Sequence, residues 1–415
     1  MKNRFEFKKV DKHLQKARQK LSSANEREIA LFEATELWRK GKLMESLKLH
    51  LKTLEKYPKD IWNAKKCQLH AFSLGRKDLV LKASTIALRA CEGEKDRLGE
   101  YVFGMHSFAL HENNRNEEAI ELIKKRREAN DTLDCWAIHA VCHSLYALGR
   151  VDEAIGWMER WENAWQSSSN FMFSHNYWHM ALLHVEKGQV EKALEIYDEK
   201  IVSRDVKTIS LLTNAAGLLL RLEVRKIETG GRLEDLVKYL KDKKLWHLDP
   251  FFDLFVSYTL SKCGKHRKMA SFLSSLEHKI AVMEKLANES CKESGELLNC
   301  CNVETWKYVI LPFCKGISHY VRGEFQKSFE EIDHVFASST HEKINASNEQ
   351  LDVLIELFLD VLLRLSKKDK ALQMIDKQIS KMHTPLPYLT SLKENLVHDP
   401  SLLNLSTQVN ECSAK

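Results

Sequence analysis

Two pairs of histidines are the residues of this chain whose type and spacing are best suited to chemistry. His139 and His143 are four residues apart, and so are His175 and His179. Residues four apart on an α-helix lie on the same face, one turn from each other. Because imidazole exchanges protons near neutral pH and binds divalent metal ions, each pair could act in acid–base catalysis or supply two metal ligands.

The distance between the two pairs suggests that they meet. The pairs are 36 residues apart, close to one helical hairpin, and packed helices lie about 8–10 Å apart. The four imidazoles are therefore expected near a common point and would be the catalytic groups if the protein is an enzyme. No metal or other cofactor is predicted, since Ala140 and Asn176 stand where a His-Glu-x-x-His motif has its glutamate and a catalytic zinc generally needs a third protein ligand.

A repeated turn indicates the elements that position these histidines. Eight positions combine a helix-ending residue with a mostly small residue five positions later: Gly41, Gly75, Asn114, Gly149, Gly188, Gly264, Gly323 and Ser366. Four of the seven steps between them are 34 to 39 residues, and the step of 76 from Gly188 to Gly264 is close to two such units. Glycine can adopt the left-handed conformation that ends a helix, and hairpins of this size must stack to bury their apolar faces.

This spacing resembles the tetratricopeptide repeat. We therefore expect an all-α fold, a right-handed superhelix (α-solenoid) of tetratricopeptide-like helical hairpins; a helical toroid of catalytic type remains an alternative. The expected parts are a basic N-terminal helical segment at 1–26, the clearest repeats at 27–200, divergent repeats continuing the superhelix at 201–382, and a C-terminal tail at 383–415. Breaks are expected at 229–231, 249–250, 289–302 and 338–349.

In tetratricopeptide repeats the first helix of each hairpin lines a concave groove. That geometry predicts a ligand-binding groove rich in histidine and aromatic residues. Its predicted lining residues are Trp62, Tyr101, Phe108, His111, Glu112, Trp136, His139, His143, Tyr146, His175, Trp178, His179 and Glu186.

Two motifs resemble the tetratricopeptide repeat protein 38 family most specifically. They are His-Asn-Tyr-Trp-His at 175–179 and His-Ala-Val-Cys-His at 139–143. The resemblance adds Asn176 and Asp253 to the expected ligand-binding residues and implies a solenoid that curls into a closed pocket, but no established reaction.

The chain also departs from the family pattern at three positions. Tyr146 stands in place of a glutamate, Phe255 in place of a histidine, and Leu351 in place of an arginine within the segment 345–352. These departures put any chemistry shared with the family in doubt.

Charge and composition limit the partners. The net charge of +6 is carried by the first twenty residues, which hold eight Lys and Arg against two acidic residues, so the rest of the chain is balanced. A nucleic-acid partner is not expected without a basic stripe, nor a membrane without a long apolar run. Ten cysteines without a Cys-x-x-Cys pair are typical of reduced thiols, which favours the cytoplasm. The sequence indicates no oligomeric state.

Three functions remain open from the sequence. The first is a cytosolic binding protein that holds a peptide or a small molecule in the groove. The second is an enzyme that uses the four histidines for acid–base or metal-assisted chemistry on a small substrate. The third is a scaffold with an inert histidine cluster.

Overall fold

The computed structural model is all-α, as the sequence predicts. It describes residues 2–91, 97–129, 134–204, 208–294, 303–344, 346–382 and 384–398, and no strand occurs among them. These residues form two compact units: unit 1 comprises 1–141 and 276–307, and unit 2 comprises 142–275 and 308–415. The arrangement within each unit is described below.

The repeated turn is confirmed at every predicted position. All eight turn residues, including the two that are not glycine (Asn114 and Ser366), have a positive φ between 55° and 81°. The long step from Gly188 to Gly264 contains a further turn of the same kind at Lys226, with φ 65°. Lys226 lies midway, 38 residues from each neighbour, so the repeat continues through a stretch where its turn residue is not a glycine.

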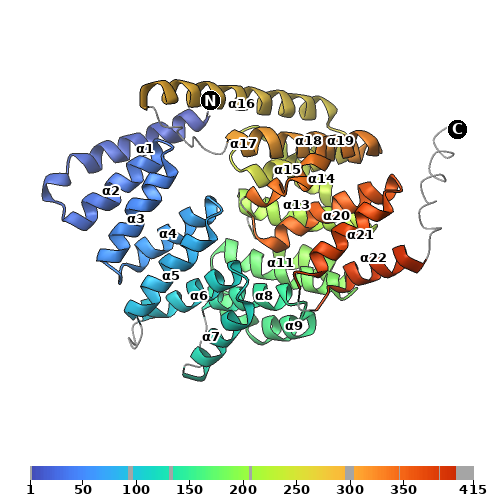
Figure 1. Cartoon of the computed structure of the whole chain (residues 1–415), viewed down its shortest axis with the longest axis horizontal. Helices are drawn as coiled ribbons and strands as arrows, with labels where there is room; N and C mark the ends of the chain where they lie inside the picture. The colour runs from blue at the N-terminus through green and yellow to red at the C-terminus, as the bar shows by residue number, and fades with distance from the viewer. Residues whose placement is uncertain are drawn as a thin grey trace. The chain divides into compact units, whose positions relative to one another are not determined.

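Unit 1 is a row of antiparallel helices in which each contacts the next from α1 to α7 (Figure 1). Its helices are α1 (Lys2–Arg18), α2 (Glu26–Arg39), α3 (Leu43–Lys56), α4 (Ile61–Ser73), α5 (Lys77–Cys91), α6 (Arg97–Glu112), α7 (Asn116–Ala129) and α17 (Val303–Thr305). The basic start predicted from the sequence forms α1. Two helices, α8 (Cys135–Ala147) and α16 (His266–Ser294), run through the division between the units.

Unit 2 contains the remaining hairpins. Its helices are α9 (Val151–Arg160), α10 (Glu162–Trp165), α11 (Asn170–Glu186), α12 (Val190–Ile196), α13 (Ile209–Val224), α14 (Arg232–Leu240), α15 (Pro250–Lys262), α18 (Leu311–Val321), α19 (Phe325–Ala337), α20 (Asn348–Arg364), α21 (Lys368–Ile379) and α22 (Pro387–His398). Helices α11, α13, α15 and α18 contact one another in that order, and α20 contacts both α19 and α13. The chain of unit 2 therefore turns back on itself and encloses α13.

Three first helices of the unit 2 hairpins are buried on all sides. Every residue of 172–186 in α11, 211–222 in α13 and 251–261 in α15 is buried. Helix α14, by contrast, is a second helix and buries only Leu233, Leu236, Val237 and Leu240, one apolar stripe. A helix without an exposed face belongs to the interior, so α11, α13 and α15 form the core of unit 2 and the second helices cover it.

The boundaries expected from the sequence are partly met. Gly230 has a positive φ, and Asp249 caps α15 with Pro250 in the first turn. The break expected at 289–302 begins later, because α16 continues to Ser294, and the tail beyond residue 398 lies outside the described residues. No helix in the described part of the chain is long and apolar enough to cross a membrane.

Candidate functional site

Three of the predicted histidines meet inside unit 2. His143 comes from α8, while His175 and His179 come from α11, and one ring nitrogen of each lies within 4.8 Å of the others. The ring centroids of His143 and His179 are 4.4 Å apart, and those of His175 and His179 are 4.7 Å apart. The three side chains are at most 6% exposed, so water reaches this cluster poorly. We call these residues the histidine cluster.

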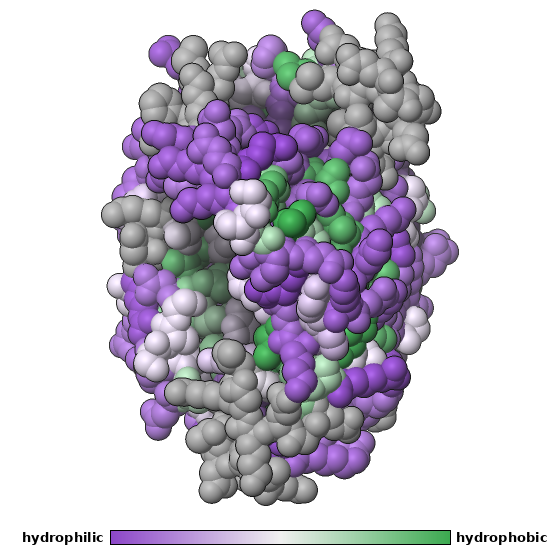
Figure 2. Space-filling model, turned by 90° about the vertical axis from the view of Figure 1, so that its left-hand side faces the viewer, coloured by the Kyte–Doolittle hydropathy of each residue, from purple (hydrophilic) through white to green (hydrophobic). Residues whose placement is uncertain are grey.

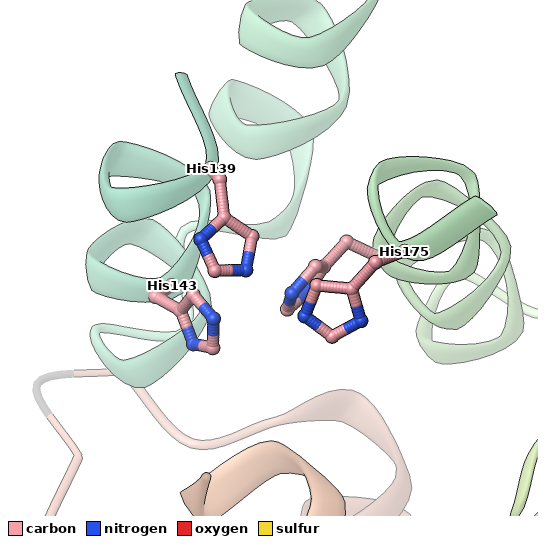
Figure 3. A group of neighbouring side chains, drawn as sticks. His139, His143 and His175 are labelled. Atoms are coloured by element: carbon pink, nitrogen blue, oxygen red, sulfur yellow. The ribbon is translucent and has the colours of Figure 1, made fainter. Parts of the chain in front are cut away.

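The fourth predicted histidine, His139, lies on the same helix as His143. The division between the units falls between Val141 and Cys142, but α8 itself is continuous, so the helix places His139 one turn before His143 on the same face. Figure 3 shows His139, His143 and His175 as neighbouring side chains, the first two from α8 and the third from α11. Within unit 1, the His139 ring also lies 6.2 Å from that of Phe108 and 5.8 Å from that of Trp136.

A carboxylate orients His143. Its Nδ1 is 2.8 Å from Oε2 of Glu349, which lies in the first turn of α20 and is fully buried. With Glu349 ionised, its carboxylate only accepts hydrogen bonds, so in that state Nδ1 of His143 donates and carries the proton. In the neutral imidazole, Nε2 of His143 then has a lone pair for a proton or a metal ion.

His175 is held between an amide and two aromatic rings. Nδ2 of Asn214, from α13, is 3.1 Å from Nδ1 of His175. The imidazole is stacked with Phe171 at 5.0 Å and with Trp178 at 5.5 Å between ring centroids. Burial, with a smaller contribution from nearby His143, lowers the pKa of His175 to about 3. This imidazole is therefore neutral at pH 7.

A buried network of ion pairs fixes the helices around the cluster. Arg225, which follows α13, donates two hydrogen bonds of 2.7 Å to the carboxylate of Glu356 on α20 and another to Glu186 on α11. One turn earlier, Arg221 donates to the backbone oxygen of Glu349 at 2.7 Å and to the hydroxyl of Tyr146 at 3.2 Å. Because the side chains of both arginines are at most 6% exposed, the network ties α8, α11 and α20 to α13.

A small cavity adjoins the cluster. It has a volume of about 10 Å³, and its lining includes Trp178, Asn214, Arg221 and Glu349. That volume holds about one water molecule. A peptide or an organic ligand would not fit into it.

The structure places the other predicted site residues in different surroundings. Asn176 is fully buried, and neither polar atom of its side chain has a hydrogen-bond partner among the described residues. Asp253 is paired with His247 and accepts from its backbone N–H, which explains its burial without a ligand.

In unit 1, buried His111 contacts Asn116 at 2.9 Å, and buried Glu112 pairs with Lys77.

The aromatic part of the predicted groove is an open pocket of unit 1. Trp62, Tyr101 and Trp136 line this pocket, and Trp62 and Tyr101 are strongly exposed. The expectation that one concave groove holds both the histidines and these aromatic residues therefore needs correction. Because α11 is buried on all sides, His175, Trp178 and His179 face the core of unit 2 instead of an open surface.

Sequence reasoning missed five residues of this site. Asn214, Arg221, Arg225, Glu349 and Glu356 contact the histidines or join the helices that carry them, but none forms a local motif with a histidine. Glu349 lies within the segment 345–352, which resembles the tetratricopeptide repeat protein 38 family. The family pattern leaves position 349 unspecified, so it indicated neither Glu349 nor its partner.

Comparison with known proteins adds little to this description. No family model matches the chain. Among solved structures, the chain is similar to the structure of Naa15/Naa10 bound to HypK-THB, with 12% sequence identity and a TM-score of 0.26. The match covers 86% of this chain and 58% of that chain. A TM-score this low does not establish a shared arrangement of helices, and the resemblance to the tetratricopeptide repeat protein 38 family stays a proposal.

Proposed function

We propose that this chain is a helical-repeat binding protein whose ligand is a divalent transition-metal ion, held by His143, His175 and His179. The observation that carries the proposal is the convergence of three buried imidazoles whose ring nitrogens lie within 4.8 Å of one another. Three histidines are a known protein ligand set for zinc, with the fourth position left to water. Neither motif alone holds a third ligand, and for that reason no metal is expected from the motifs; the meeting of His143 with His175 and His179 supplies a set of three.

The dimensions of the cluster support an ion. Nitrogen ligands lie about 2.0–2.1 Å from zinc, so in a tetrahedral site they are about 3.4 Å apart. Side-chain rotations that bring the ring nitrogens about an ångström closer would complete such a site. The cavity of about 10 Å³ beside Trp178, Asn214 and Glu349 is too small for the peptide or small molecule expected from the sequence, whereas a metal ion needs no such space.

The groups around the cluster support the same ligand. Histidines that bind metals usually donate their second ring N–H to a carboxylate or another acceptor, and Nδ1 of His143 donates to Glu349. Asn214 would do the same for His175 if its amide turned by 180°, because its oxygen would then accept from Nδ1. That turn would break the contact of 3.4 Å in which Oδ1 of Asn214 accepts from Nε2 of Gln350. Both partners orient ligands that α8 and α11 already bring together.

An enzyme is the second candidate, and the water-sized cavity beside Glu349 and Trp178 is the observation that favours it. A bound divalent ion would supply Lewis acidity, while the histidines and Glu349 would hold and move protons. Zinc-loaded protein would then hydrate carbon dioxide, a substrate of nearly the size of water, faster than the His179→Ala variant. Equal rates would leave metal binding as the function.

The binding proposal is tested by titrating zinc into protein that was purified without a histidine tag and stripped with a chelator. We expect one zinc ion per chain, and we expect His179→Ala to lose it. The matched control is His184→Ala, which removes another buried histidine of α11 that contacts Gln189 at 2.7 Å, outside the cluster. Zinc binding that survives in His179→Ala, or its absence from folded wild-type protein, would contradict the proposal.

A further inference from the structure

The pocket of unit 1 has the size and the lining of a site for a small organic ligand. Its volume is about 610 Å³, within the range of about 300–1,000 Å³ that is usual for ligand sites. It lies between α2, α4, α6 and the first turn of α8. We call it the aromatic pocket; its lining includes Trp62, Tyr101, Trp136, Arg27, Lys59 and Lys65.

Aromatic side chains give the pocket surfaces for stacking. Trp62 is 56% exposed and Tyr101 42% exposed, so both are among the exposed large hydrophobic residues in the described part of the chain. The view in Figure 2 shows a face of the molecule on which hydrophilic side chains predominate and hydrophobic ones gather in small separate areas. Aromatic rings exposed in a pocket of a largely hydrophilic surface favour a small planar ligand over a broad protein interface.

The charges of the lining favour an anion. Three cationic residues line the pocket against one acidic residue, Asp60, and Arg27 is paired with Asp60 at 2.6 Å. The ammonium group of Lys65 lies 2.9 Å from Oε1 of Gln68. An ammonium has three N–H donors, so Lys65 can also donate to a ligand.

A cationic ligand held in an aromatic cage is disfavoured, because lysine side chains of the protein already contact the tryptophan rings. Nζ of Lys65 lies 4.3 Å from the ring centroid of Trp136, and Nζ of Lys66 lies 5.2 Å from that of Trp62. The ammonium of Lys65 occupies the face of Trp136 that a ligand cation would use, and the charges of both lysines repel a cation. An anionic ligand would be attracted by the same lysine charges.

We propose that the aromatic pocket binds a small aromatic carboxylate, whose ring stacks on Trp62 and Tyr101 while its carboxylate accepts a hydrogen bond from Lys65. This site is separate from the histidine cluster, and its ligand differs from the metal ion proposed there. Either proposal can therefore fail without the other.

The test compares three probes that share an indole ring and differ in charge. Isothermal titration of the full chain is expected to show binding of indole-3-acetate, about ten- to hundred-fold weaker binding of neutral indole-3-acetamide, and weaker binding still of cationic tryptamine. Lys65→Met should reduce the affinity for indole-3-acetate to that for the amide without changing the affinity for the amide.

Two further variants complete the design. Lys66→Met removes the same charge from the next residue of α4, which does not line the pocket, and should change the acetate affinity by less than about threefold. Trp62→Ala, at a strongly exposed position, should weaken all three probes. Tryptamine binding more tightly than the acetate, equal affinities of wild type and Lys65→Met, or no binding of the acetate at millimolar concentration would each overturn the proposal.

Discussion

Nδ1 of His143 on α8 and Oε2 of Glu349 on α20 are 2.8 Å apart, although 206 residues separate them in the sequence. Both side chains are at most 1% exposed. A buried imidazole and a buried carboxylate each need a partner. The pair therefore joins the histidine cluster to the helix that turns back onto α13.

Glu349→Gln tests whether this carboxylate orients a metal ligand. We expect zinc affinity to fall about 10–100-fold, the usual cost of losing a partner of a metal-binding histidine. Competition with a chromophoric chelator measures the change. Glu330→Gln, an exposed position on α19, is the control and should bind zinc like the wild type. Unchanged affinity in Glu349→Gln would contradict a role of the Glu349 carboxylate in orienting a metal ligand.

The ion pairs around the cluster are predicted to stabilise unit 2. Replacing Glu356 with Ala leaves Arg225 without its bidentate partner and should lower the free energy of unfolding by about 3–5 kcal/mol, because breaking a buried pair leaves a buried charge. Asp198→Ala breaks the half-exposed pair with Arg232, which should cost less than about 1 kcal/mol. Urea denaturation followed by circular dichroism measures both; similar losses would contradict the expectation.

Two glycine-to-alanine variants test how much the backbone conformation of a turn, as opposed to steric crowding, determines the change in stability. An added Cβ at Gly188 or Gly156 meets nothing within 4 Å, but Gly188 has φ +75° while Gly156 lies within α9. Gly188→Ala should destabilise the fold by about 1–2 kcal/mol. Gly156→Ala should stabilise it by about 0.5–1 kcal/mol. Thermal melting of the two variants checks the opposite signs, and two shifts in the same direction would show that the turn conformation does not set the cost.

Binding in the aromatic pocket should depend on pH. Burial lowers the pKa of Lys65 to about 8, against the opposing charge of Asp134, so the ammonium is charged below pH 8 and increasingly neutral above it. Burial raises the pKa of Asp134 to about 6, despite hydrogen bonds from the backbone N–H groups of Trp136 and Ala137, so Asp134 stays ionised between pH 7 and 9. The affinity for indole-3-acetate should therefore fall over that range.

The measurement is a series of titrations from pH 7 to 9. Above pH 8 the charged fraction of Lys65 falls about tenfold per pH unit, and the affinity should approach that of the amide. The affinity for indole-3-acetamide, which does not depend on this charge, serves as the control. Lys59, Arg27 and Asp60 also line the pocket, so a pH dependence that persists in Lys65→Met would assign the effect to another group.

The sequence predicted the repeat because its signal is local. A tight turn that ends one helix and starts the next often needs a residue with a positive φ, and all eight predicted turns have one. Lys226 escaped notice because lysine rarely occupies that conformation. The two histidine pairs were likewise visible, since four-residue spacing fixes one face of a helix.

The enclosure of the site could not be predicted in the same way. The periodicity of α11 does not reveal that helices cover it on all sides, nor does the sequence of α20 indicate that Glu349 reaches His143. Arg225 and Glu356 are 131 residues apart, and their pairing follows from α20 turning back onto α13. Such contacts depend on the path of the whole chain, which local spacing does not encode.

The most direct test of the metal proposal is anomalous diffraction at the zinc absorption edge from crystals of the full chain grown with zinc. We expect one strong peak between α8 and α11, about 2.0–2.1 Å from a ring nitrogen of each of His143, His175 and His179. An ordered histidine cluster without a peak, or zinc bound only at other sites, would contradict the account.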